Sequence, residues 1–185
     1  MKTNEVIYSV VVPVYNEELV FEECYKRLKN VMDSTKESYE IIFINDGSRD
    51  NTLKIGKNIS NLDANIKVIN LSRNFGHQVA VTAGMDFACG KAITIIDADL
   101  QDPPEVILDM IKKWKKGFDV VYGKRLKRKG ETLFKKVTSK AYYRILKSMT
   151  TVDIPVDTGD FRLIDRKVCD ALKQLPERNR YVRGL

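Results

Sequence analysis

One stretch of the chain indicates the fold class: Ala92-Ile93-Thr94-Ile95-Ile96-Asp97-Ala98-Asp99-Leu100-Gln101-Asp102-Pro103-Pro104-Glu105. Its β-branched beginning is typical of a strand buried on both faces of a parallel sheet. Asp102 then fits a helix cap, because two prolines follow it and Glu105 comes three residues later. Asp97 and Asp99 are therefore expected in a loop at the carboxyl end of a strand, where open α/β sheets bind their ligands.

Asp97 and Asp99 form a candidate site for a divalent cation. Two carboxylates this close repel each other unless a cation or a proton separates them. Mg²⁺ is typically held by one or two carboxylates, and phosphate oxygens complete its coordination shell. A bare Asp-x-Asp pair also fits a solvated acidic loop, because short motifs often match by chance. Residues elsewhere in the chain are needed to distinguish a cation site from a solvated loop.

Length and composition indicate one globular domain over residues 1–185. The chain is 43% hydrophobic and 31% charged, and its length allows a sizeable core. Cys24, Cys89 and Cys169 have no Cys-x-x-Cys spacing, which predicts inert thiols in or near the core rather than a zinc site or a disulfide framework. No signal peptide is visible, and no apolar run approaches the roughly 18 residues of a membrane span.

The net charge of +7 is unevenly distributed along the chain. Residues 1–120 hold 15 Lys/Arg and 18 Asp/Glu, whereas residues 121–185 hold 17 Lys/Arg and 7 Asp/Glu. A basic segment that follows an acidic one indicates an anionic partner, which could be a membrane surface, a phosphate-bearing ligand or a nucleic acid.

Strand-like and helix-like segments alternate along the chain. We expect strands over residues 6–12, 39–45, 66–71, 93–96 and 119–122. Between them, helices are expected to begin at the caps Asn16, Asp50 and Asn74, and a further helix is expected over residues 104–116. This alternation predicts an α/β fold, a mostly parallel sheet with helices on both faces.

Polar residues follow the end of each of the first four expected strands. The pairs are Asn16 and Glu17, Asp46 and Ser48, Arg73 and Asn74, and Asp97 and Asp99. Because parallel strands end at one edge of the sheet, these four clusters are expected to meet in one crevice.

The motif search excludes several kinds of site. The chain has no P-loop, no Gly-x-Gly-x-x-Gly after the first strand and no Gly-x-Ser-x-Gly elbow. The only histidine, His77, has no second His or Cys nearby, so we expect a surface or packing residue rather than a catalyst or a zinc ligand. The acidic residues of the crevice, with a cation, suit a phosphate-bearing ligand.

Six longer motifs occur along the chain. In order, they are Val11-Val12-Pro13-Val14-Tyr15-Asn16-Glu17-Glu18, Asn45-Asp46-Gly47-Ser48-Arg49-Asp50-Asn51-Thr52, Ser72-Arg73-Asn74-Phe75-Gly76-His77-Gln78, Asp97-Ala98-Asp99-Leu100-Gln101-Asp102-Pro103-Pro104-Glu105, Tyr122-Gly123-Lys124-Arg125 and Asp157-Thr158-Gly159-Asp160-Phe161-Arg162-Leu163. Together they resemble the signatures of family 2 glycosyltransferases with the glycosyltransferase-A fold. They are most similar to the polyprenyl-phosphate sugar transferases, a group that includes dolichol-phosphate mannosyltransferase and bactoprenol glucosyltransferases.

This resemblance implies an inverting enzyme that requires Mg²⁺ or Mn²⁺. It would move a sugar from a nucleotide-diphosphate sugar (a UDP-sugar or GDP-mannose) to an undecaprenyl or dolichyl phosphate, at the cytoplasmic face of the membrane. Nucleic acid is not an expected partner, and a homo-oligomer is left open. A family 2 enzyme acting on a polysaccharide or another hydroxyl acceptor is the first alternative. A metal-dependent phosphohydrolase using Asp97 and Asp99 fits less well, because haloacid-dehalogenase-like phosphatases carry such a pair after their first strand.

The resemblance also implies roles for individual residues. Asp97 and Asp99 would hold the metal, and Asp99 would ligate the ion that bridges the diphosphate. The residues implied at the nucleotide are Pro13, Tyr15, Glu17, Asp46, Ser48, Asp97, Ala98 and Gln101.

Asp99, Arg125 and Asp160 make up the expected catalytic set. Arg125 would add a positive charge at the leaving group, although it also fits a solvated charge in a basic run. Asp160, or with less support Asp157, is the candidate base if the acceptor phosphate needs one. Both also fit structural roles, with Asp160 pairing to Arg162.

Members of this group usually continue into membrane helices after an arginine-rich stretch like residues 178–184. Because the sequence ends at Leu185, we expect a single catalytic domain over residues 1–185, taken from a longer protein whose C-terminal membrane region is absent.

A basic amphipathic helix over residues 124–147 predicts binding to an anionic membrane surface. This segment holds ten Lys/Arg against one acid, and apolar residues from Leu133 to Met149 recur every four positions. Each basic residue near such a surface contributes about 1 kcal/mol, screened by salt. We expect the chain to sediment with anionic liposomes at low salt and to be released at high salt. Gln at Lys135, Lys136, Lys140 and Arg144 should weaken this binding without unfolding; equal binding by this variant and the parent would leave the helix as ordinary core.

Overall fold

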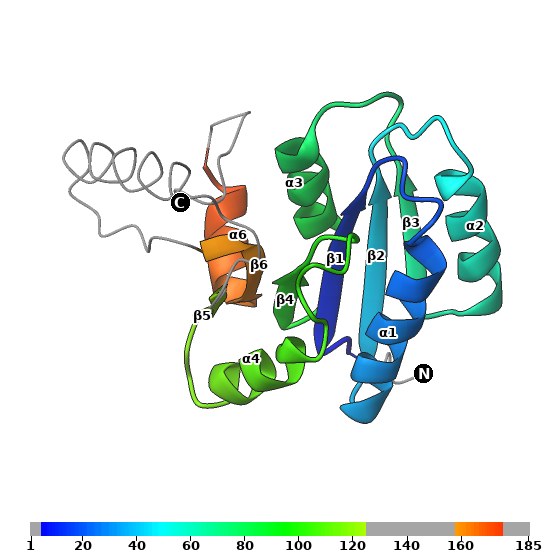
Figure 1. The fold of residues 1–185 in the computed structure, drawn as a ribbon. Helices are drawn as coiled ribbons and strands as arrows, with labels where there is room; N and C mark the ends of the chain where they lie inside the picture. The colour runs from blue at the N-terminus through cyan, green and yellow to red at the C-terminus, as the bar shows by residue number, and fades with distance from the viewer. Residues whose placement is uncertain (1–4, 125–157, 176–185) are drawn as a thin grey trace, which may run out of the picture.

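The computed structural model describes residues 5–124 and 158–175, which form a six-stranded sheet covered by helices (Figure 1). The strands are β1 (Tyr8–Val14), β2 (Tyr39–Asn45), β3 (Ile66–Asn70), β4 (Ala92–Ile95), β5 (Val120–Lys124) and β6 (Thr158–Asp165). The helices are α1 (Phe21–Ser34), α2 (Thr52–Leu62), α3 (His77–Phe87), α4 (Val106–Trp114) and α6 (Arg166–Lys173).

The sheet is mostly parallel, as the alternating sequence pattern predicted. Its strand order is β3-β2-β1-β4-β6-β5, and the pairings from β3 to β4 are all parallel. Only β6 runs the other way, antiparallel to β4 and to β5. The start of β6 therefore lies at the same edge as the carboxyl ends of β1 to β4.

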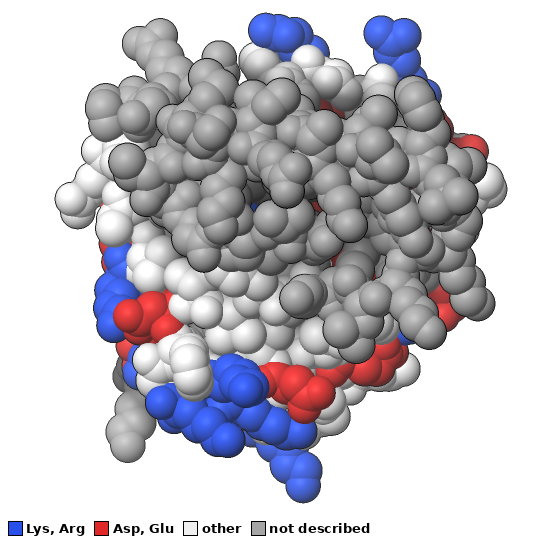
Figure 2. Space-filling model, turned by 60° about the vertical axis from the view of Figure 1, so that its left-hand side comes forward, with Lys and Arg blue, Asp and Glu red and all other residues white. Residues whose placement is uncertain are grey.

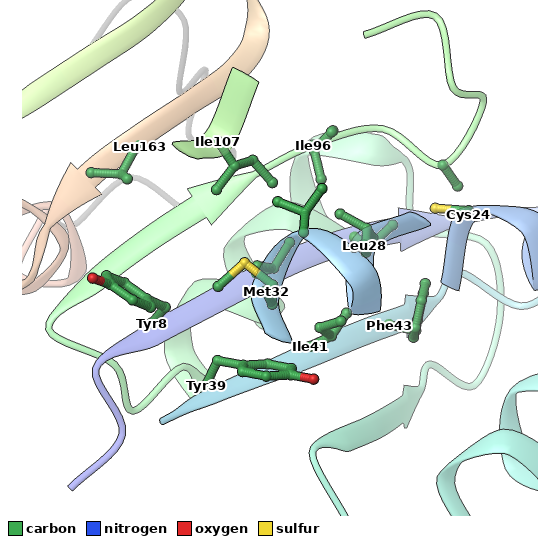
Figure 3. Close-up of a cluster of buried hydrophobic side chains, with 14 of the residues drawn as sticks. Tyr8, Cys24, Leu28, Met32, Tyr39, Ile41, Phe43, Ile96, Ile107 and Leu163 are labelled. Carbon is green, nitrogen blue, oxygen red and sulfur yellow. The ribbon is translucent and has the colours of Figure 1, made fainter. Parts of the chain in front are cut away.

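Helices cover both faces of the sheet because successive strand residues point to opposite sides. Val10 and Val12 belong to a cluster with side chains from α1 and α4, whereas Val11 packs with residues of α3 and α6. Figure 3 shows the first cluster, in which Leu28 of α1 and Ile107 of α4 are among the labelled side chains. The second cluster is tight, since a Cβ on Gly84 of α3 would lie 2.3 Å from Val11 Cγ1.

Two predicted boundaries around β1 are wrong. β1 continues through Pro13, where the sequence suggested a stop, and pairs with β2 as far as Val14. The Asp46 N–H donates to the Val14 carbonyl, so the backbone polar groups of Val14 point toward β2. Those of the preceding residue, Pro13, point toward β4 instead. Pairing with β4 ends at Val11, so the N–H group that proline lacks is not needed for a hydrogen bond between the strands. Asn16 does not cap α1; it adopts a φ of 55° in a loop, and the helix begins at Phe21.

The beginning of α4 also differs from the prediction. Asp102 is buried and lies before the N-cap position, because the helix starts at Val106 and Glu105 is its N-cap residue. The carbonyl of Pro103 accepts the N–H of Val106, so the two prolines form a turn that precedes the helix.

The cysteines only partly match the prediction of inert thiols in or near the core. Cys24 and Cys169 are buried, and burial raises the pKa of the Cys24 thiol to about 12. Cys89 is exposed instead, directly after α3. All three are free thiols.

The described surface mixes opposite charges. Figure 2 shows Lys and Arg beside Asp and Glu along the lower edge of one face. Pairs such as Lys115–Glu37 and Lys167–Asp119 are exposed and contribute little to stability. Most of the basic segment 121–185 lies outside the described residues, including residues 125–147 of the predicted helix and the arginine-rich stretch 178–184, whereas Lys124 ends β5. Within the described ranges, no helix is both long and apolar enough to cross a membrane.

Replacing a core leucine tests this packing. Leu28 is fully buried, so Leu28→Ala leaves a cavity and should lower the free energy of unfolding by about 2–5 kcal/mol. Leu62 is 90% exposed and serves as the matched control; Leu62→Ala should stay within about 0.5 kcal/mol of the parent. Urea denaturation measures both, and similar losses in the two variants would contradict this core.

Candidate active site

A pocket of about 490 Å³ opens where the carboxyl ends of β1, β2, β3 and β4 meet. Its lining residues come from all four strand-end segments, so the predicted crevice is confirmed. They are Pro13, Val14, Tyr15, Glu17, Asp46, Asn74, Gly76, His77, Ala80, Asp97, Ala98 and Asp99.

Most of the residues that the sequence suggested for the crevice or for the nucleotide line this pocket, but Asn16, Ser48, Arg73 and Gln101 do not. Ser48 accepts the N–H of Asn16 on its Oγ at 2.9 Å and so joins two loops. Gln101 is exposed, and its N–H donates to Asp99 Oδ1 at 3.0 Å. Arg125 and Asp157 lie outside the described residues.

The loop after β1 is bound to the loop after β2 by a series of hydrogen bonds. The Glu17 N–H donates to Thr52 Oγ1 at 2.8 Å, and the Glu18 N–H donates to Asp50 Oδ2 at 3.1 Å. In return, Glu18 Oε2 accepts the N–H of Asn51 at 2.9 Å. These bonds fix the backbone on which Glu17 reaches the pocket.

The carboxylate of Asp46 determines where α3 begins. It is 3% exposed and accepts the N–H of Phe75 at 2.7 Å and the N–H of Gly76 at 2.9 Å. Gly76 has a φ of 99°, which favours glycine, and it occupies the N-cap position of α3. Asn74 was predicted to cap this helix and does not. A carboxylate from a neighbouring strand end provides the acceptor instead, and single-sequence reasoning could not predict that contact.

Asp160 is not among the lining residues of the pocket, but it lies beside two residues that are, His77 and Asp97. His77 Nε2 lies 3.1 Å from Asp160 Oδ2 and 3.6 Å from Asp97 Oδ1. Each of these three residues has one side-chain atom that could bind a metal ion, and the three atoms lie within 4.8 Å of one another. The predicted pairing of Asp160 with Arg162 is present as well, at 3.9 Å.

The position of His77 in the pocket was not predicted, although its side chain is 39% exposed, as a surface residue would be. A signal was present in the sequence, because His77 closely follows Arg73 and Asn74, one of the polar pairs at strand ends. Because no second histidine or cysteine lies nearby, the sequence predicted a surface or packing role for His77 instead.

Burial and neighbouring carboxylates raise the pKa values of Asp97 and Glu17 in this pocket. Burial is the main cause that raises the pKa of Asp97, the charges of Asp160 and Asp99 add to it, and His77 opposes it. Burial likewise raises the pKa of Glu17, and the charge of Asp99 adds to that shift. A divalent cation would relieve this repulsion.

The donor atoms fit such a cation. Asp97 Oδ1 is buried and accepts no hydrogen bond from the described part of the chain, while Asp99 is exposed on the wall of the same pocket. Carboxylate oxygens, completed by ligand phosphates, are what Mg²⁺ and Mn²⁺ prefer. The residues present are therefore suited to hold one of these ions.

The model of the family "Glycosyl transferase family 2" matches residues 9–173. The chain belongs to glycosyl transferase family 2. It is 64% identical to "Uncharacterized glycosyltransferase YkcC" of Bacillus subtilis (strain 168), over 96% of this chain and 55% of that protein. It is 40% identical to the bactoprenol glucosyl transferase of Shigella phage SfV, over 96% of this chain and 58% of that protein. The chain thus spans little more than half the length of these curated relatives.

Solved structures share the fold of this glycosyltransferase domain. The mannosyltransferase PcManGT from Pyrobaculum calidifontis, in complex with GDP-Man and Mn²⁺, has a TM-score of 0.65 and 20% identity, over 94% of this chain and 48% of its own. Glucosyl-3-phosphoglycerate synthase from Mycobacterium tuberculosis has a TM-score of 0.61 and 18% identity, over 88% of this chain and 58% of its own. The predicted glycosyltransferase-A fold is confirmed.

The raised pKa of Glu17 predicts how stability depends on pH. A carboxyl whose pKa is higher in the folded state costs stability when it ionises, and the cost grows as pH rises from the ordinary value of 4.5 through the folded value. As the pH rises above about 4.5, the metal-free parent should therefore lose stability relative to Glu17→Gln, until Glu17 is fully ionised in the folded state. Glu22→Gln, at an exposed position of α1, is the control and should follow the parent. Thermal melts in a chelating buffer measure the difference, and parallel curves for all three proteins would contradict it.

Proposed function

We propose that this chain is the catalytic part of an inverting polyprenyl-phosphate sugar transferase that works at the cytoplasmic face of a membrane. The donor would be a nucleotide-diphosphate sugar, and the acceptor would be a polyprenyl phosphate. The acidic pocket at the strand ends carries this proposal. It belongs to a family 2 domain that is 40% identical to a bactoprenol glucosyl transferase over 96% of this chain.

The donor nucleotide would lie along the ends of β1 and β2. Tyr15 is 40% exposed at the pocket and offers a ring face to a base, while Glu17 offers acceptors to ribose hydroxyls. Both oxygens of Asp46 already accept backbone N–H groups, so a nucleotide would use its remaining lone pairs.

Asp97 and Asp99 would hold Mg²⁺ or Mn²⁺ against the diphosphate. The bound ion would neutralise the charge that develops on the nucleoside diphosphate as it leaves. Asp99 extends into the pocket from an exposed loop, whereas Asp97 provides a buried oxygen that accepts no hydrogen bond from the described residues. Arg125 is proposed to add a positive charge at the same leaving group.

The acceptor phosphate would approach the pocket from the side on which β6 and Asp160 lie. It is an anion and already a nucleophile, so the chain has to orient it more than to activate it. Asp160 lies there next to Asp97 and His77, and it is the proposed base. Attack on the face opposite the leaving diphosphate inverts the anomeric carbon.

Asp99→Asn tests the donor site. Loss of one carboxylate weakens a hard-ion site but leaves an exposed loop intact, so the variant should lose the metal-dependent part of nucleotide binding and still fold. Asp109→Asn is the matched control, because Asp109 is an exposed carboxylate on α4 paired with Lys112. Calorimetric titration of UDP and GDP with and without Mn²⁺ measures the effect. Parent-like Mn²⁺ dependence in Asp99→Asn would contradict the metal assignment.

The reaction itself is tested by offering the chain labelled UDP-sugars and GDP-mannose, with Mn²⁺ and undecaprenyl or dolichyl phosphate in detergent. The expected product is a lipid-linked sugar that is absent with Asp99→Asn. Transfer only to a polysaccharide would favour another family 2 activity, and release of free phosphate from simple phosphate esters would favour a phosphohydrolase.

A further inference from the structure

The only histidine of the chain occupies a position that the donor site does not explain. His77 is the first residue of α3, directly after Gly76, whose N–H is held by Asp46. The buried carboxylate of Asp46 therefore fixes the backbone from which the imidazole extends, and His77 lines the pocket.

The imidazole lies beside two carboxylates that come from different strands. The antiparallel register pairs Ile95 of β4 with Arg162 of β6, and its continuation places Asp160 opposite Asp97. His77 Nε2 lies 3.1 Å from Asp160 Oδ2, within hydrogen-bond range, and 3.6 Å from Asp97 Oδ1, beyond it. When Asp160 is ionised its carboxylate only accepts, so Nε2 then carries the proton and donates the hydrogen bond to Asp160.

The other oxygen of Asp160 faces a cationic group. Arg162 Nη2 lies 3.9 Å from Asp160 Oδ1, and Arg162 is 3% exposed. The guanidinium also lies 5.2 Å from the ring centroid of Tyr122, which limits its movement. Asp160 is thus contacted on one oxygen by His77 and approached on the other by Arg162, so the plane of its carboxylate is set by both.

We propose that His77 is a positioning residue, whose Nε2–H holds the carboxylate of Asp160 in the orientation needed for sugar transfer. This inference rests on the proposed function, in which Asp160 is the base on the acceptor side. His77 need not contact the sugar, the nucleotide or the cation. A displacement of about 1 Å at such a group can cost roughly 100-fold in rate.

Two substitutions separate positioning from mere packing. His77→Gln can place an amide N–H near the position of Nε2, whereas His77→Leu fills similar space without a donor. We expect His77→Leu to lower kcat for transfer by about 100-fold, with KM for the donor and Mn²⁺-dependent nucleotide affinity unchanged. His77→Gln should keep most of the activity. Equal losses in both variants with lowered thermal stability, or a loss of Mn²⁺ affinity in His77→Leu, would overturn the proposal.

A double-mutant cycle shows whether His77 acts through Asp160. If it does, His77→Leu should slow the parent but should not further slow Asp160→Ala, because the group that it positions is already gone. Additive losses would overturn the proposal.

A measurement without turnover keeps this inference separate from the proposed function. Because the chain has one histidine, its imidazole nitrogens give one unambiguous set of NMR signals. The Nε2 signal should shift in Asp160→Ala and stay in place in Asp170→Asn, a control on the exposed face of α6. An unchanged Nε2 signal in Asp160→Ala would overturn the pairing whether or not transfer is seen. If the parent makes no lipid-linked sugar, the proposed function fails, and the nitrogen shifts alone decide the His77–Asp160 interaction.

Discussion

The hydrogen bonds from the backbone of residues 75 and 76 to the buried carboxylate of Asp46 are the interaction on which the rest of the site depends. Burying a carboxylate is costly unless its oxygens are paired, and here each oxygen accepts one N–H group. The same two bonds join the end of β2 to the beginning of α3. They therefore determine the direction of α3 and the place where His77 enters the pocket.

A second constraint is the repulsion among carboxylates that the scaffold brings together. Glu17, Asp97 and Asp99 come from two different strand ends, and each lines the same pocket. Strand pairing and the bonds between the first two loops hold them there, although burial, together with the repulsion among the carboxylates, raises the pKa values of Glu17 and Asp97. A cavity with this charge is suited to a cation and the phosphates that accompany it.

The reversed strand β6 separates this sheet from a purely parallel one, and the proposed chemistry depends on it. A parallel strand in this place would present its carboxyl end at the pocket edge, and Asp160 would lie at the far edge. Because β6 runs antiparallel, its first residues lie at the pocket, where Asp160 meets Asp97 and His77. In the proposed reaction, the donor-side and acceptor-side groups thus come from strands of opposite direction.

The sequence by itself determined the class of fold, the position of most strands and the edge where the site would form. Buried runs such as residues 39–45 and 92–96 mark strands because local hydrophobicity and β-branching are sufficient there. The polar residues after each run predicted the pocket because parallel strands end at one edge. The family motifs added the expectation of a nucleotide-sugar donor and a polyprenyl-phosphate acceptor, which local pattern alone left open.

Only the tertiary structure decided how α1, α3 and α4 begin, how β6 runs and what His77 contacts. Asn16, Asn74 and Asp102 have the side chains of helix caps, yet a turn or a distant carboxylate starts each helix elsewhere. The strand direction of β6 and the meeting of His77 with Asp160, 83 residues apart in sequence, depend on packing between elements. Local propensity is read from neighbouring residues, whereas these contacts join groups that only the folded sheet brings together.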